Sequence, residues 1–164
     1  MARVLIVGGG CRGKRLAGEL VADGFAARIT TRTDAGRTTI EASGAECWIG
    51  TPDRLATLRG ALDGVSILCW LLGTATGTQA QLRELHSSRL QFFLTQAIDT
   101  TVRGFVYEVR GSSTLQPALA AGERLVQAWA QQNSIPTAFL RADPHDHAAW
   151  AGEAREAIES LLCA

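Results

Sequence analysis

The stretch Arg3-Val4-Leu5-Ile6-Val7-Gly8-Gly9-Gly10-Cys11-Arg12-Gly13-Lys14-Arg15-Leu16-Ala17 decides how the rest of the chain is interpreted. Its apolar run, Val4 to Val7, has the composition of a buried parallel strand. The run passes directly into glycines at the G-x-G-x-x-G spacing, and a helical pattern follows. A strand, a glycine turn and a helix in this order are typical of a dinucleotide-binding fold.

Each of the three spaced glycines has its own task in such a turn. We expect Gly8 to turn the chain off the strand with a positive torsion and Gly10 to let the backbone approach a pyrophosphate. Gly13 lets the helix pack close to the strand. The first amides of the helix, around Cys11 and Arg12, then point at the phosphates, and the helix dipole favours their charge. The turn therefore predicts a diphosphate site.

Length and composition favour one α/β domain, residues 1–164, with a single extended core. The formal net charge is zero and the sequence pI is about 6.8, so no overall charge attracts nucleic acid or a membrane surface. No apolar run approaches the roughly 20 residues of a membrane span, and we expect a cytoplasmic protein. The four cysteines are far apart in sequence, which indicates reduced thiols and no metal site.

Strand and helix patterns alternate along the whole chain. The expected strands are 4–7, 27–31, 46–49, 65–72, 104–109 and 136–140. The expected helices are 12–22, 34–43, one that starts at Pro52 and runs through Leu62, one over 82–98, one that ends near Asn133, and a closing helix over 150–161. This alternation predicts a doubly wound parallel sheet with right-handed crossovers.

The end of the second expected strand bears on the choice of nucleotide. An acidic residue there would bind both ribose hydroxyls and select NAD, but this chain has Thr31-Arg32-Thr33. The guanidinium of Arg32 suits a 2′-phosphate, and Arg12 is expected to reach the same group. We therefore predict NADP in preference to NAD. Asp34 is expected to cap the next helix, and its movement toward the ribose is the alternative that would favour NAD.

Two further loops are predicted to line the same site. Asp53, in Gly50-Thr51-Pro52-Asp53, flanks the adenine edge as a helix-terminal charge or an adenine contact. Leu72 and Gly73 end the fourth strand and begin the small-residue loop 73–77. Ligands of open α/β sheets sit at such carboxyl ends, and this loop is expected beside the nicotinamide ribose.

Several segments together resemble the NmrA-like branch of the atypical short-chain dehydrogenases/reductases. They are the glycine turn, Thr31-Arg32-Thr33, Gly44-Ala45-Glu46, Gly50-Thr51-Pro52-Asp53, Gly122 through Trp129, and Ile135-Pro136-Thr137-Ala138-Phe139-Leu140-Arg141. The resemblance covers almost the whole chain, which is short for that family and stops about where its substrate-binding extension begins. It implies a Rossmann core of about six strands, ordered 3-2-1-4-5-6, that binds NADP(H). It also implies either a reductase or a cofactor-binding regulator without catalysis.

The catalytic pattern of that family, where active, is Tyr-x-x-x-Lys, and this sequence departs from it. Tyr107 is the only tyrosine, Gly111 stands four residues later, and the only lysine is Lys14 in the phosphate turn. Tyr107 lies in an apolar strand, so we expect a packed aromatic ring with a bonded hydroxyl. The usual proton relay is absent from the sequence.

Other candidates for proton chemistry are few. By the family likeness Ser112 and Ser113 occupy the place of a catalytic or substrate-orienting serine, although turn formation is the stronger interpretation because no base is nearby in sequence. The segment Asp143-Pro144-His145-Asp146-His147 would lie over the nicotinamide, with His145 or His147 as a proton donor. A metal site is disfavoured there, because residues alternating in an irregular segment rarely complete a coordination shell. An aspartate that caps the last helix is the simpler interpretation.

Two functions therefore compete. The protein either binds NADP(H) without turnover and reports redox state to a regulatory partner, or reduces a small quinone, flavin or carbonyl acceptor with NADPH. A methyltransferase is disfavoured because its cofactor also requires an acid where Arg32 stands. The apolar face of the helix over 82–98 is interpreted as core, and a homodimer through it is a further hypothesis.

Overall fold

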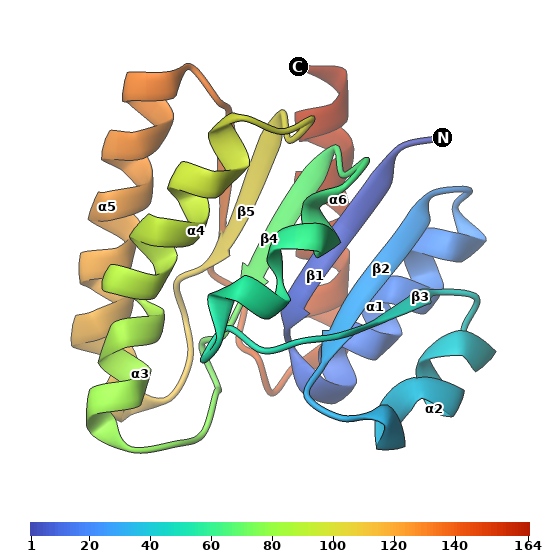
Figure 1. Cartoon of the computed structure of the whole chain (residues 1–164), viewed down its shortest axis with the longest axis horizontal. Coiled ribbons are helices and arrows are strands. Elements are labelled where there is room, and N and C mark those ends of the chain that lie inside the picture. Colours follow the sequence, from blue (N-terminus) through green and yellow to red (C-terminus); the bar gives the residue numbers. More distant parts are fainter.

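Six parallel strands form one sheet in the computed structural model, which describes every residue from Met1 to Ala164 (Figure 1). The strands are β1 (Arg3–Gly8), β2 (Ala26–Thr31), β3 (Glu46–Ile49), β4 (Ile67–Leu71), β5 (Gly104–Glu108) and β6 (Thr137–Leu140). Their order is β3-β2-β1-β4-β5-β6, and every neighbouring pair is parallel. The predicted doubly wound Rossmann topology is confirmed, with the strand order reversing between β1 and β4.

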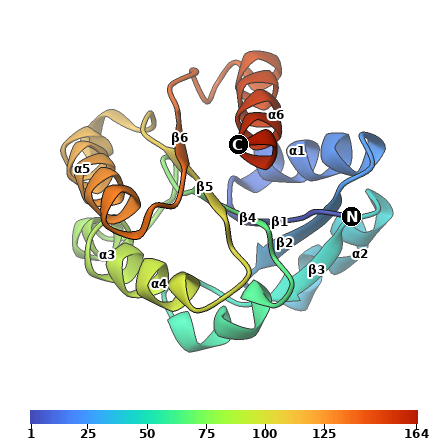
Figure 2. The ribbon, with the colours of Figure 1, turned by 90° about the horizontal axis from the view of Figure 1, so that it is seen from above.

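Helices cover both faces of the sheet (Figure 2). They are α1 (Gly10–Ala22), α2 (Arg37–Ala42), α3 (Gln79–Leu85), α4 (Ser88–Ile98), α5 (Gln116–Asn133) and α6 (His147–Cys163). Helices α1 and α6 lie on one face, and α3, α4 and α5 lie on the other. None of the helices combines the length and apolar character that a membrane-spanning segment requires.

The sheet separates two apolar clusters. Leu5 and Val7 of β1 pack into the cluster shared with α4 and α5, while Val4 and Ile6 pack into the cluster shared with α1 and α6. All four side chains are fully buried. A strand covered on both faces needs apolar residues at successive positions, which explains the continuous run near the start of the sequence.

The prediction of a single helix over 82–98 is wrong, because the chain forms two helices, α3 and α4, with a break at His86 and Ser87. At the break the carbonyl of Leu85 accepts a hydrogen bond from the indole Nε1 of Trp70, at 3.1 Å. The hydroxyl of Ser87 donates to the carbonyl of Arg83, at 2.7 Å. Side chains thus occupy backbone acceptors that would otherwise continue the helix.

The prediction of a helix that starts at Pro52 is also wrong. Two 3₁₀ helices, η2 (Leu55–Thr57) and η3 (Arg59–Leu62), take its place. The hydroxyl of Thr57 donates to the carbonyl of Arg54 at 2.6 Å, and the carbonyl of Thr57 accepts from Trp48 Nε1 at 2.8 Å. These side-chain bonds compete with an α-helical ladder and hold tighter turns.

The segment after β2 is shorter and less regular than expected. It starts as a 3₁₀ helix, η1 (Asp34–Gly36), and continues as α2. Asp34 does not cap either helix, because its carboxylate pairs with Arg37 at 2.6 Å, one turn along the chain. An i, i+3 ion pair therefore replaces the expected capping bond.

Close packing of α5 on the sheet depends on Gly122. A Cβ at this position would lie 2.0 Å from the hydroxyl oxygen of Tyr107, well inside contact distance. We expect Gly122→Ala to lower the free energy of unfolding by about 1–3 kcal/mol, the usual cost of overpacking. Urea unfolding followed by circular dichroism measures this change.

A matched control is Gly152→Ala in α6, where an added Cβ meets no atom within 4 Å. Removing a helix-interior glycine there should stabilise the protein by about 0.5–1 kcal/mol. Equal stabilities of the two variants would contradict the packing of α5 against Tyr107.

Candidate functional site

The glycine turn joins β1 to α1 with the geometry that the spacing predicts. Gly8 has φ of 85°, and a Cβ there would lie 2.5 Å from the carbonyl oxygen of Leu71. A Cβ at Gly13 would lie 2.7 Å from the carbonyl oxygen of Gly8. A larger residue at Gly13 would push α1 away from the end of β1, and one at Gly8 would clash with the end of β4, whereas Gly10 faces open space. The start of α1 is thus open to a ligand.

Two adjoining cavities lie in front of this turn, and together we call them the cleft. The larger, of about 440 Å³, runs along the glycine turn and the loop after β4. The smaller, of about 100 Å³, lies at the ends of β2 and β3 and includes Thr31 and Gly50. Both are lined by Gly8, Arg32, Leu72 and Ala75. The cleft thus extends from β3 across the switch point to β4, where open α/β sheets bind ligands.

Arg32 lies where the two cavities meet. Its side chain is 65% exposed, and its Nη2 pairs with Oδ2 of Asp53 at 3.1 Å. Asp53 follows β3, so the pair links the loops after two neighbouring strands. The carboxylate holds the guanidinium at the rim of the cleft, while most of the guanidinium surface stays in solvent.

Arg12 does not lie at this rim, and its expected reach toward a 2′-phosphate is wrong. Its side chain is only 6% exposed, and its Nη1 donates to Oε2 of Glu108 at 2.6 Å. Its Nη2 donates to the hydroxyl of Thr74 at 2.7 Å. A charged side chain in the interior requires such partners, so the guanidinium turns inward below the glycine turn.

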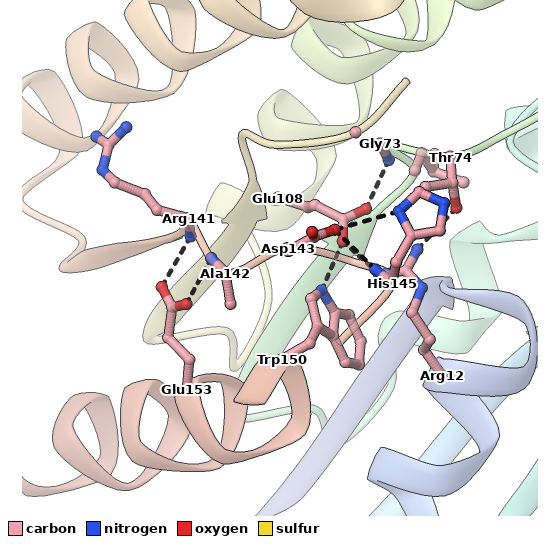
Figure 3. A network of polar contacts seen from close by, with 12 residues as sticks. Arg12, Gly73, Thr74, Glu108, Arg141, Ala142, Asp143, His145, Trp150 and Glu153 are labelled. Atoms are coloured by element: carbon pink, nitrogen blue, oxygen red, sulfur yellow. Dashed lines mark hydrogen bonds and ion pairs between the residues drawn. The ribbon is translucent and has the colours of Figure 1, made fainter. Parts of the chain in front are cut away.

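Glu108 is the centre of a buried polar network (Figure 3). One carboxylate oxygen accepts from the backbone N–H of Gly73 at 2.7 Å. The other accepts from Arg12 and from the indole Nε1 of Trp150, each at 2.6 Å. The Arg12 guanidinium also lies 4.5 Å from the centre of the Trp150 ring. We call Arg12, Gly73, Thr74, Glu108 and Trp150 the Glu108 network.

The Glu108 network connects α1, the loop after β4, β5 and α6. This network was not predicted from the sequence, where Glu108 was interpreted only as part of a strand. A signal was present, because one carboxylate in the otherwise apolar run Phe105 to Val109 must find partners when the strand is buried. Which partners it finds depends on residues 42 and 96 positions away.

The loops after β4 and β5 are bonded to one another beside this network. The backbone N–H of Ser112 donates to the carbonyl of Gly73 at 3.0 Å. Ser112 and Ser113 are exposed, and Ser113 begins a 3₁₀ turn that leads into α5. Neither serine lines the cleft. Turn formation therefore accounts for these two serines.

The loop after β6 holds the remaining candidates. His145 is 89% exposed, and its backbone N–H and Nδ1 both contact Oδ1 of Asp143, at 2.9 and 3.1 Å. The backbone bond from His145 holds the pKa of Asp143 below its ordinary value. Asp146 accepts from the N–H of Ala149 at 3.2 Å, which confirms the expected aspartate cap of the last helix.

A second buried polar pair lies on the opposite face of the sheet. The Tyr107 hydroxyl donates to Nδ1 of His86 at 2.7 Å, and Nε2–H of His86 donates to the Leu72 carbonyl at 3.2 Å. The prediction of a packed tyrosine with a bonded hydroxyl is confirmed. Burial raises the pKa of Tyr107 and lowers that of His86 to about 4. The imidazole is therefore neutral near pH 7.

The remaining predicted residues lie around the cleft without lining it. Cys11 is exposed at the start of α1, and Thr33 is exposed after β2. Gly73 is buried, with its N–H committed to Glu108. The structure therefore brings Gly8, Gly10, Thr31, Arg32 and Leu72 together as cleft-lining residues.

The fold and the cleft define a Rossmann-type α/β domain, and comparison with solved structures agrees. BdcA from E. coli superposes with a TM-score of 0.74 at 18% identity, over 94% of this chain and 89% of that one. A short-chain dehydrogenase/reductase superfamily protein from Agrobacterium tumefaciens, solved with bound NAD, gives 0.67 at 21% identity. Vestitone reductase from alfalfa gives 0.63 at 14% identity. At these identities the likeness establishes the fold.

The coverage of these structures differs. This chain aligns over 85% of its length with the Agrobacterium protein and with vestitone reductase, but spans only 48% and 56% of those chains. The aligned region is thus about half of each of those chains. No protein-family model matches the sequence, and no curated protein matches it.

The Glu108 network makes a prediction about stability. Glu108→Gln removes the counter-charge of Arg12 and leaves a buried guanidinium unpaired, which should cost about 3–5 kcal/mol of unfolding free energy. The matched control is Glu123→Gln, which removes an equal charge from the exposed ion pair with Arg141. That change should cost no more than about 1 kcal/mol. Similar losses of unfolding free energy in the two variants, measured by urea unfolding, would contradict a special contribution of Glu108 to stability.

His86 makes a prediction about pH. Its pKa is about 4 in the folded protein and 6.5 in an unfolded chain, so the unfolded state binds the proton first. The stability that neutral His86 contributes is complete above pH 6.5. It falls by about 1.4 kcal/mol per pH unit as the pH drops from 6.5 toward 4.

Comparing unfolding at several pH values in His86→Gln and wild type isolates this contribution, because glutamine does not titrate. The variant should lose less stability on acidification than wild type. His147→Gln, at an exposed position that makes no side-chain hydrogen bond or ion pair, should keep the wild-type dependence. Parallel curves for wild type and His86→Gln would contradict the burial of a neutral imidazole.

Proposed function

We propose that this chain is a cytoplasmic, NmrA-like dinucleotide-binding protein that takes NADP(H) in the cleft and reports on it without turnover. One observation carries the proposal: a continuous cleft joins the glycine turn to Arg32. The diphosphate would bind at the first amides of α1, near Gly10 and Cys11. The adenosine would extend toward Thr31, Thr33 and Asp53. Leu72 and Gly73 would border the nicotinamide ribose.

The geometry of the turn supports a diphosphate ligand. The amides at the N-terminus of α1 are unpaired within the helix and point out of it, and the helix dipole favours an anion. The larger cavity, of about 440 Å³, lies directly against Gly9 and Gly10. A nicotinamide dinucleotide is also the ligand named for the Agrobacterium structure of the same fold.

Arg32 supports NADP rather than NAD. It stands at the end of β2 in place of an acid, and its exposed guanidinium lies at the junction of both cavities. A 2′-phosphate can accept paired hydrogen bonds from such a planar group. Asp53 would hold Arg32 in position. Asp34 is paired with Arg37, so it does not offer the ribose a free carboxylate.

Binding without turnover is supported by the positions of the tyrosine and the lysine, the two residue types that catalysis in the NmrA-like family would need. The Tyr107 hydroxyl is buried and bonded to His86, and its raised pKa opposes proton transfer. The only lysine, Lys14, lies on α1.

The partner of a non-catalytic protein would be a regulatory protein, with a homodimer as a second hypothesis. The competing function is an NADPH-dependent reductase of a quinone, flavin or carbonyl, with Ser112, Ser113 or His145 near the chemistry.

Calorimetric titration with NADP, NADPH, NAD and NADH tests the proposal. Wild type should bind the two phosphorylated forms more tightly. Arg32→Gln should weaken NADP binding by about 10- to 100-fold, the value of a charge-assisted contact, and leave NAD binding unchanged. Arg103→Gln is the matched control. This exposed arginine makes no ion pair, and it directly precedes β5, at the amino-terminal ends of the strands and thus away from the cleft.

Each outcome has a definite meaning. Absence of binding by all four nucleotides refutes the function, and equal affinity for NADP and NAD refutes the role of Arg32. NADPH oxidation followed at 340 nm with quinone and flavin acceptors should show no enzyme-dependent rate. A rate that depends on the protein would establish the reductase instead.

A further inference from the structure

A further cavity, of about 390 Å³, opens between α3 and α5 and lies outside the cleft. Its volume falls in the range of small-molecule sites. Its apolar wall comes from Leu82 of α3, from Leu115 in the turn before α5, and from Ala118 and Ala121 of α5. A ligand that fills it must therefore present an apolar body.

The only charged side chain that lines this cavity is positive. Arg83 lines it, no aspartate or glutamate does, and the Arg83 side chain makes no ion pair or hydrogen bond within the protein. Arg89, six residues along, instead pairs with Glu84 and donates to two backbone carbonyls. An unpaired guanidinium beside apolar surface attracts a planar anion that can accept two hydrogen bonds.

The cavity also lies against the N-terminus of α5, through Thr114 in the preceding turn and Pro117 in the first turn of the helix. The positive end of this 18-residue helix adds to the field of Arg83, and its first turn contains no acidic residue. One cation and one helix end suit a singly charged carboxylate better than a doubly charged phosphate.

His86 forms the inner wall and is only 1% exposed. Both of its nitrogens are engaged, with Tyr107 and with the Leu72 carbonyl, so it offers the ligand a neutral surface. Leu72 and the neighbouring Leu85 line the cleft on the other side. His86 thus lies between this cavity and Leu72, which lines the cleft.

We propose that this cavity binds a small apolar carboxylic acid. The carboxylate pairs with Arg83, and the apolar body packs on Leu82 and Ala118. The site is distinct from the cleft and does not require a nucleotide to be bound there.

The test is fluorescence titration of the nucleotide-free protein with 2-naphthoate, indole-3-acetate and 4-phenylbutyrate, the last by displacement of 2-naphthoate. Wild type should show saturable binding of at least one acid. Arg83→Gln should weaken it by about tenfold or more, as expected for loss of a charge-assisted contact. Neutral 2-naphthylmethanol should bind wild type and Arg83→Gln equally. Ala121→Phe, at an exposed position, should fill the cavity and abolish binding.

The matched control is Arg124→Gln, which removes another exposed arginine that makes no ion pair, on α5 but outside the cavity. It should bind 2-naphthoate like wild type. The proposal is overturned if no acid binds saturably up to about 1 mM, if Arg83→Gln and Arg124→Gln behave alike, or if Ala121→Phe still binds. Circular dichroism confirms that each variant is folded. Because no nucleotide is present, failure here leaves the dinucleotide proposal untouched.

Discussion

The buried carboxylate of Glu108 is the constraint on which the organisation of the cleft depends. A charge in the interior is tolerated only when every acceptor is satisfied, and here Arg12, Trp150 and the N–H of Gly73 satisfy it. These partners come from α1, α6 and the loop after β4, so one side chain fixes the glycine turn relative to the strands behind it. The cleft in front of the turn is consequently formed before any ligand arrives.

The buried side chains of Glu108 and His86 both form hydrogen bonds with the peptide unit between Leu72 and Gly73. Glu108 accepts from the N–H of Gly73, and His86 donates to the carbonyl of Leu72, which belongs to the same peptide bond. The two side chains reach it from opposite faces of the sheet, one from β5 and one from the break between α3 and α4. Because Leu72 lines both parts of the cleft, this double clamp sets the wall that a ligand meets.

Local patterns in the sequence predicted the elements that local chemistry determines. The apolar runs, the glycine spacing and the alternation of helix and strand gave the sheet and the position of the cleft, because each signal lies within about 15 residues. The direction of the Arg12 side chain depends on Glu108, 96 residues later, and could not be derived that way. The break at His86 depends similarly on Tyr107 and Trp70. Arg32 lies at the cleft as expected because the end of β2 is placed by topology alone.

The polar side chains near the carboxyl edge of the sheet are committed mainly to structure. Glu108 neutralises Arg12, His86 holds Tyr107, and Glu153 accepts from the backbone N–H groups of Arg141 and Ala142 in the loop after β6. A general acid or base needs a pKa near the working pH and access to the reacting atom. Burial moves the pKa values of His86 and Tyr107 away from neutrality, in opposite directions, and encloses both groups. The contacts that hold Leu72 and Glu108 in place therefore leave His86 and Tyr107 poorly suited to exchange protons near pH 7, in line with the proposed binding of a nucleotide without turnover.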